Sequence, residues 1–204
     1  MKLQIVPPCQ GVQWFKQGVR TFLRQPLAFT GLFFMFMAAV SLLSLLPVIG
    51  TPLALALLPA ATLGLMAATQ IAEQGQFPMP QVLIAGFRAG KDRLRSMVVL
   101  GVLYAVGFIL VMGISATVDG GQFARVYLLG GELSPEVVLQ GDFQSAALVA
   151  MVLYLPLSLL FWHAPALVHW HGITPMKSLF FSAVACLRNF WAFTVFGLVW
   201  VAAF

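Results

Sequence analysis

The sequence predicts an all-α fold: a polytopic transmembrane helical bundle with short amphipathic helices at the membrane interface. Hydrophobic residues make up 61% of the 204 residues and charged residues only 8%, whereas about 25% of a soluble domain is charged. The mean hydropathy of +0.96 is correspondingly high, and long runs without any charge recur along the chain. So few charges cannot cover a soluble domain of this size, which indicates an integral membrane protein.

Five apolar runs are candidate membrane spans, because a helix needs about 20 apolar residues to cross the hydrocarbon core. In chain order they are Pro26–Leu46, Leu53–Ala72, Ser96–Val118, Gln144–Val168 and Phe190–Phe204. The fourth run contains Pro156 and Pro165, and the last has only 15 residues. We therefore expect either that the chain is truncated before a sixth span, or that its fifth span is short or tilted and ends outside.

The basic residues are distributed unequally between the two sides of the membrane. If the spans alternate, three segments share one side and contain ten of the eleven: Lys2, Lys16, Arg20, Arg24, Arg88, Lys91, Arg93, Arg95, Lys177 and Arg188. Arg125 lies in the opposite connection, Asp119–Phe143. Because Lys and Arg accumulate on the cytoplasmic side, we predict a multi-pass bacterial inner-membrane protein with a cytoplasmic N-terminus. The net charge of +5 then reflects topology, and no nucleic-acid partner is expected.

Amphipathic segments precede the odd-numbered spans, and each is predicted to be a helix lying in the interface. With about 100° between successive residues, Gly11–Arg24 has one apolar and one basic face. A similar segment follows Pro80, with Leu83 and Phe87 on its apolar side, and a third follows Pro175. Basic side chains of the first two segments are predicted to contact anionic lipid headgroups; they are Lys16, Arg20, Arg24, Arg88, Lys91 and Arg95.

The entry into the first and last spans is repeated in sequence. Leu23–Thr30 and Leu187–Thr194 are identical at five of eight positions, and Leu94-Arg95 is a weaker match before the third span. We predict one transmembrane domain, residues 1–204, of pseudo-repeated helical hairpins over about 8–73, 80–170 and 175–204, with the last unit truncated. The alternative is that an arginine before each span only follows from the positive-inside rule.

Small residues recur every four positions in the second span, at Ala56, Ala60, Gly64 and Ala68. Small side chains let helices in a membrane approach closely. This ridge is therefore predicted to pack against another span, within the chain or between protomers.

The sequence contains no catalytic, cofactor-binding or metal-binding motif, so we predict a protein that is not an enzyme and has no cofactor. Histidines are the strongest polar candidates, at His163, His169 and His171, but on an ideal helix the three do not share one face. His169 and His171, beside Trp170, are typical of the interface. His163 lies deeper and is predicted to face the protein interior, as a buried structural or a functional residue. Because Pro165 lacks an N–H, a carbonyl near Phe161 is expected to accept from another helix.

Three stretches carry a resemblance to a family of uncharacterised bacterial polytopic inner-membrane proteins: 2–7, 119–125 and 161–172. The resemblance covers the whole chain and implies a helical membrane bundle without an established activity, so no functional residue is carried over. Members of that family continue past this C-terminus. The repeated entry into the spans is more weakly similar to the membrane-anchor domains attached to glycerophosphodiester phosphodiesterases.

Two functions remain open at this stage. The first is a non-catalytic protein that organises membrane lipids or protein partners, such as a second copy of itself or an envelope protein docked on the acidic connection Asp119–Phe143, which is otherwise a solvated linker. The second is a transporter or channel component for a small solute. The spans contain few polar residues, which favours the first.

Overall fold

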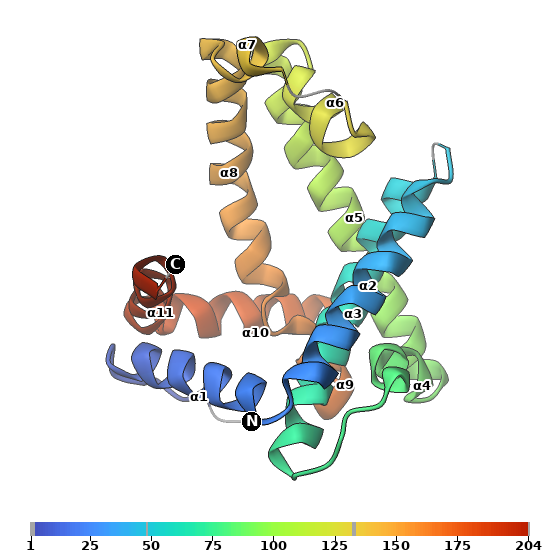
Figure 1. Cartoon of the computed structure of the whole chain (residues 1–204), viewed down its shortest axis with the longest axis vertical. Coiled ribbons are helices and arrows are strands. Elements are labelled where there is room, and N and C mark those ends of the chain that lie inside the picture. Colours follow the sequence, from blue (N-terminus) through green and yellow to red (C-terminus); the bar gives the residue numbers. More distant parts are fainter. Residues whose placement is uncertain (1–2, 48, 132–133, 204) are drawn as a thin grey trace.

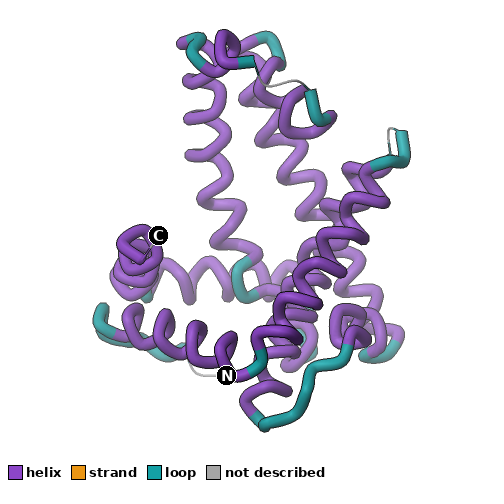
Figure 2. The backbone as a smooth tube through the Cα atoms, viewed as in Figure 1, coloured by secondary structure: helices purple, strands orange, loops and turns teal. Residues whose placement is uncertain are grey.

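The computed structural model describes residues 3–47, 49–131 and 134–203, and every regular element in this part of the chain is helical (Figures 1 and 2). The all-α prediction is confirmed. Lys2, Phe204 and residues 132–133 of the connection Asp119–Phe143, which the sequence predictions include, lie outside the described ranges.

Four helical segments are long and apolar enough to cross a membrane. They are α2 (Pro26–Ser44), α3 (Gly50–Glu73), α5 (Lys91–Asp119) and the pair α8 (Gly141–Phe161) and α9 (Ala164–His171). These segments match the first four predicted spans. A fifth span is counted if α10 (Pro175–Arg188) and α11 (Phe190–Ala203), which meet at an angle of 76°, form one broken span.

Several helices lie across one end of the long helices, and we call this end the basal layer (Figure 1). It contains α10, α11, α1 (Gln10–Arg24), the short 3-10 helix η1 (Pro80–Ile84) and α4 (Ala85–Arg88). Within it, α11 packs on α1 through the Trp14–Phe193 and Phe15–Trp200 ring pairs, with centroids 5.2 and 5.1 Å apart. Gly11 lies so close to the backbone at Ala192 that a Cβ atom would have no room.

The first and third predicted amphipathic segments are helical, as α1 and α10, but the second does not form a single helix. The position of α1 and α10 in the membrane interface stays a prediction. The chain from Pro80 forms η1 and α4 and then turns at Gly90, whose φ of +98° is favourable only for glycine. Lys91 and Arg95 therefore belong to the first turns of the spanning helix α5. The apolar residues of this segment recur with a helical period, but the turn at Gly90 divides the single helix that this period predicted.

The opposite connection, expected to be a loop, contains two short helices, α6 (Gln122–Leu129) and α7 (Pro135–Val138). The Asp119 carboxylate accepts from the N–H groups of Gly121 and Phe123 at 2.8 and 2.6 Å. It thereby satisfies backbone donors at the start of α6. Thr51 donates to the carbonyl of Leu128 at 3.0 Å, which joins the C-terminal end of α6 to α3.

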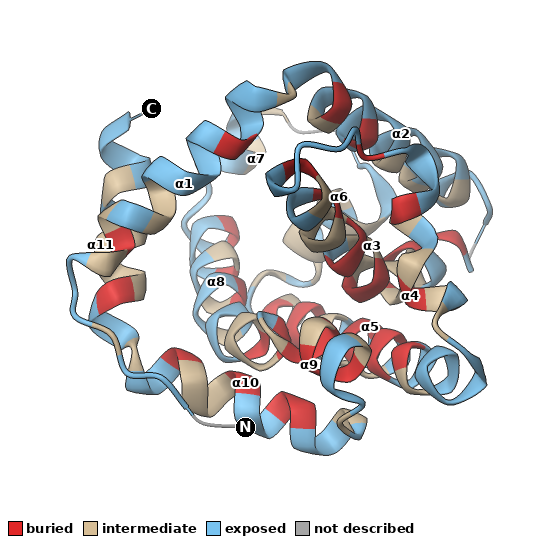
Figure 3. Ribbon diagram, turned by 90° about the horizontal axis from the view of Figure 1, so that it is seen from below, coloured by how far each residue is buried: buried red, intermediate tan, exposed pale blue. Residues whose placement is uncertain are grey.

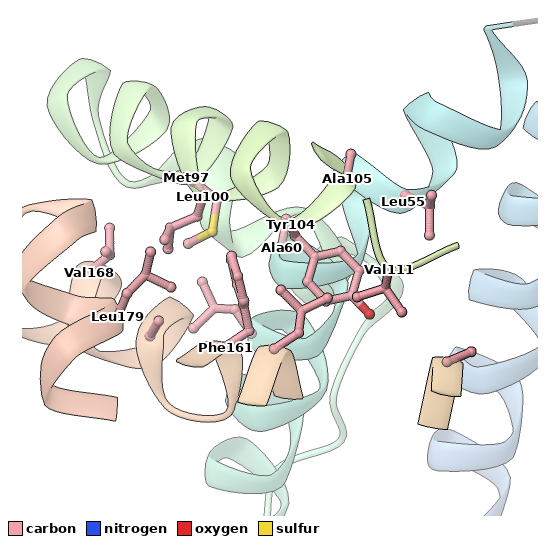
Figure 4. Packing of buried hydrophobic residues seen from close by; sticks show 14 residues of the cluster. Leu55, Ala60, Met97, Leu100, Tyr104, Ala105, Val111, Phe161, Val168 and Leu179 are labelled. Atoms are coloured by element: carbon pink, nitrogen blue, oxygen red, sulfur yellow. The ribbon is translucent and has the colours of Figure 1, made fainter. Parts of the chain in front are cut away.

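The hydrophobic core lies where α3, α5, α8 and α9 meet, and α5 is its central element (Figure 4). Tyr104 of α5 packs edge-on against Phe161 of α8, with ring centroids 5.1 Å apart. Gly101 faces the Ala56 backbone of α3 without space for a side chain. Figure 3 shows the buried residues concentrated on these helices, whereas α2 is largely exposed. Its exposed apolar surface is suited to contact with lipid.

Candidate functional site

The structure places all six predicted lipid-contact cations in or beside the basal layer, and all six are exposed (Figure 1). They come from α1, α4 and the first turns of α5: Lys16, Arg20, Arg24, Arg88, Lys91 and Arg95. Lys177 and Arg188 of α10 lie in the same layer, whereas Arg125 belongs to α6 at the other end. Segments that are far apart in the sequence therefore gather their positive charges at one end of the bundle. Their contact with headgroups stays a prediction.

Helix α1 uses only part of its apolar face for contacts within the protein. Trp14 and Phe15 pack against α11, but Val19, Phe22 and Leu23 remain exposed at 37%, 45% and 67%. An exposed apolar stripe beside a basic stripe is typical of a helix that lies in the headgroup region with one face toward the acyl chains.

His163 lies at the break between α8 and α9, where Ser182 of α10 enters the helix. The N–H of His163 donates to Ser182 Oγ at 2.9 Å, and the Ser182 hydroxyl donates to the carbonyl of Leu159 at 2.8 Å. In a continuous α-helix this carbonyl and this N–H would bond each other. A carbonyl near Phe161 thus accepts from another helix, but it is that of Leu159. The predicted cause is wrong, because the missing N–H of Pro165 leaves the carbonyl of Phe161 unpaired and not that of Leu159. The inserted hydroxyl accounts for the break.

The imidazole of His163 is half-buried and lies 6.0 Å, centroid to centroid, from the ring of Phe193. It lines a cavity of about 910 Å³ between the N-terminal segment, α1, α9, α10 and α11, together with Trp14, Trp170 and His171. His169 lies instead in a second cavity, beside α3 and α4. The break before α9 thus lets His163 and His171 share one cavity, which an ideal helix did not predict. The described residues contain no cluster of three or more potential metal ligands.

The ridge of small residues in α3 is buried inside the chain. Ala60 and Ala68 are 2% and 0% exposed. At Ala56 the ridge contacts a span, because Gly101 of α5 packs on its backbone. At Gly64 the prediction of a neighbouring span is wrong: a Cβ atom there would lie 2.7 Å from the Cα of Leu83 in η1. The ridge therefore also packs against the short helix η1, which the hydropathy pattern did not predict.

Two polar residues that sequence reasoning did not select join distant segments. One is Ser182, which the sequence shows only as part of a polar strip on α10. The other is Asn189, between α10 and α11: its Oδ1 accepts from the N–H of Val6 at 2.8 Å, and its Nδ2 donates to the carbonyl of Gln4 at 3.0 Å. Gln25, at the matching position of the predicted repeat, donates to the carbonyl of Gln76 at 2.9 Å. The sequence match between Leu-Arg-Gln and Leu-Arg-Asn is the feature of the sequence that could have indicated these two residues.

Comparisons with known proteins identify one similar relative in Burkholderia thailandensis, described as a probable inner membrane protein. It is 44% identical to this chain over 205 residues, and the match covers 99% of this chain and 76% of the relative. No family model matches the chain. No solved structure matches it either.

Proposed function

We infer that this chain, which belongs to the same family as the probable inner membrane protein of Burkholderia thailandensis, is an inner-membrane protein that organises anionic lipid, without catalysing a reaction. The observation that carries the proposal is the basal layer, where exposed cations from three helices lie at one end of the bundle. A protein partner, either a second copy or an envelope protein, is a further proposal that would use the same layer or the α6–α7 end.

The energetic case rests on many weak contacts. A Lys or Arg near an anionic membrane surface contributes roughly 1 kcal/mol, so one residue holds no particular lipid. Eight cations on α1, α4, α5 and α10 act together: the six predicted lipid contacts, Lys177 and Arg188. With its exposed apolar stripe in contact with the acyl chains, α1 would hold its cations at the depth of the lipid phosphates. The protein would therefore enrich anionic lipid around its basal end.

Enrichment is tested by lipid mass spectrometry on the full-length protein. Arg20→Gln, in the basal layer, should reduce the ratio of co-purified phosphatidylglycerol to phosphatidylethanolamine, because one attractive charge is lost. Arg125→Gln, at the opposite end, is the matched control and should leave the ratio unchanged. A triple variant at Lys16, Arg20 and Arg24 should give a larger effect. An unchanged ratio in the triple variant would contradict the proposal.

The proposal includes a cytoplasmic basal layer, which cysteine labelling tests. Gln74 and Gln140 are exposed and lie in connections at opposite ends of the bundle, after α3 and before α8. Each is replaced with Cys in a protein whose Cys9 and Cys186 are changed to Ser. In intact spheroplasts, an impermeant maleimide should react at position 140 and reach position 74 only after lysis, because the basic end faces the cytoplasm. The reverse pattern would refute this orientation.

A further inference from the structure

A second basal cavity of about 740 Å³ lies on the other side of the molecule from the His163 cavity, where the end of α3, η1, α4, the start of α5 and α9 come together. Three cationic or potentially cationic side chains from three different helices line it: Arg88 of α4, Arg93 of α5 and His169 of α9. No Asp or Glu is among the described residues that line it. The cavity is therefore suited to an anion.

A hydrogen bond and a turn position Arg88 and Arg93 at this cavity. Arg88 Nη1 donates to Gln81 Oε1 at 3.0 Å, which orients the guanidinium within the cavity wall. The turn at Gly90, with its positive φ, lies between Arg88 and Arg93 and lets α4 and α5 each present an arginine to the same space. Guanidinium groups bind phosphate through paired N–H donors, with more geometric specificity than an ammonium group offers.

His169 supplies a second, independent observation. Its Nδ1 atom is buried and has no hydrogen-bond partner in the described part of the chain. Buried polar atoms in proteins are nearly always paired, and because this nitrogen is buried, a ligand in the cavity would become its partner only after the His169 ring rotates. The imidazole lines the same cavity as the two guanidinium groups, so all three side chains can face one bound anion.

The rest of the wall distinguishes a lipid from a free phosphate ion. Ile71 of α3 and Phe77 and Met79 of the following connection line the same cavity, and Phe77 and Met79 are 58% and 56% exposed. Apolar side chains do not stabilise a free phosphate ion. They can stabilise a phospholipid, because its glycerol and first acyl carbons lie directly beneath its phosphate.

We propose that this cavity binds one anionic phospholipid, with Arg88, Arg93 and His169 contacting its phosphate and the apolar wall contacting its glycerol and upper acyl chain. The inference rests on the proposed function and goes further, because it assigns one discrete site within a layer that otherwise attracts lipid diffusely. Lipid bound here would also join α4, α5 and α9 of the second predicted repeat unit to the end of α3 in the first.

The test is native mass spectrometry of the full-length protein in a neutral detergent titrated with dioleoyl phosphatidylglycerol. The double variant Arg88→Gln/Arg93→Gln should lower the affinity for the first bound lipid about tenfold, as expected for the loss of charge-assisted hydrogen bonds. The comparison variant Arg20→Gln/Arg24→Gln loses the same charge from the same layer and should weaken the first binding step far less than Arg88→Gln/Arg93→Gln does. Arg125→Gln, on α6 at the opposite end, is the control that should leave this step unchanged. Arg93→Lys, which keeps the charge without the paired donors, should weaken it measurably. Inorganic phosphate at millimolar concentration and dioleoylglycerol should both fail to compete.

Each outcome decides a different point. If both double variants lose lipid equally, binding is diffuse, and the site is wrong while the proposed function stands. If neither loses lipid, both the site and the proposed function are wrong. Competition by inorganic phosphate would show a free-anion site instead. If the double variant does not fold, His169→Ala and Arg93→Lys carry the test, and unchanged affinity in both would overturn the site.

Discussion

Replacing Gly101 with alanine is expected to destabilise the bundle by about 1–3 kcal/mol, the usual cost of overpacking a well-packed core. Gly101 lies on α5 against the carbonyl of Ala56 in α3, and a Cβ atom would collide with this backbone oxygen. A backbone atom cannot move aside as the end of a flexible side chain can, so α3 and α5 would have to separate. Separation would loosen the core around Leu100 and Tyr104.

Gly113→Ala is the matched control, because Gly113 lies on the same helix with no atom within 4 Å of the Cβ position. Alanine there adds no collision and removes the entropic cost of a helical glycine, about 0.5–1 kcal/mol. Thermal unfolding of the purified protein in one detergent should therefore show a lower transition for Gly101→Ala and an equal or higher one for Gly113→Ala. Equal transitions in the two variants would show that α3 and α5 are not in close contact.

Ser182→Ala is the second substitution expected to have a large effect. It removes the hydroxyl that pairs with both the Leu159 carbonyl and the His163 N–H. Leaving two backbone groups unpaired in an apolar interior costs about 2–6 kcal/mol, at roughly 1–3 kcal/mol for each group. The thiol of Cys186 still donates weakly to the Leu159 carbonyl, at 3.8 Å, so we expect a loss at the lower end of this range. Ser182 is 0% exposed, so water does not readily replace the lost partner. The junction of α8, α9 and α10 should become the least stable part of the protein.

Ser178→Ala separates this effect from the simple loss of a buried serine. Ser178 is also 0% exposed and lies one turn earlier on α10, but its hydroxyl donates within its own helix, to the carbonyl of Pro175 at 2.7 Å. Its replacement should cost less than about 1 kcal/mol. Thermal unfolding and hydrogen exchange at residues 159–164 compare the two variants. A Ser182→Ala protein as stable as the parent would mean that α8 and α9 close into one straight helix.

The sequence predicts the long helices because their signal is local. A run such as Pro26–Leu46 contains no charge, and only a membrane span accommodates 20 such residues. The amphipathic pattern of α1 is local in the same way. The basal location of the cations follows from the positive-inside rule combined with alternating spans, and it needs no knowledge of packing.

The structural features that the sequence did not predict depend on contacts between residues that are distant in sequence. The pairing of Ser182 with Leu159 and His163 joins residues about 20 positions apart, and no periodicity within either helix indicates it. The second basal cavity forms only where α9 lies near α4, and hydropathy does not predict that arrangement. Gly90 was visible, but only its backbone conformation shows that it ends one helix and starts another.

The hydrogen bonds between Asn189 and the N-terminal segment have a consequence for biosynthesis. The hydrogen bond from Val6 to Asn189 spans 183 positions, and ribosomes add about 5–20 residues per second. Roughly 10 to 40 s therefore pass between the synthesis of the N-terminal segment and the synthesis of Asn189. During that interval Trp14 and Phe15 lack the α11 surface on which they later pack. If α1 lies at the bilayer surface, as we propose, lipid covers this face until α11 emerges, and the membrane serves as its temporary partner.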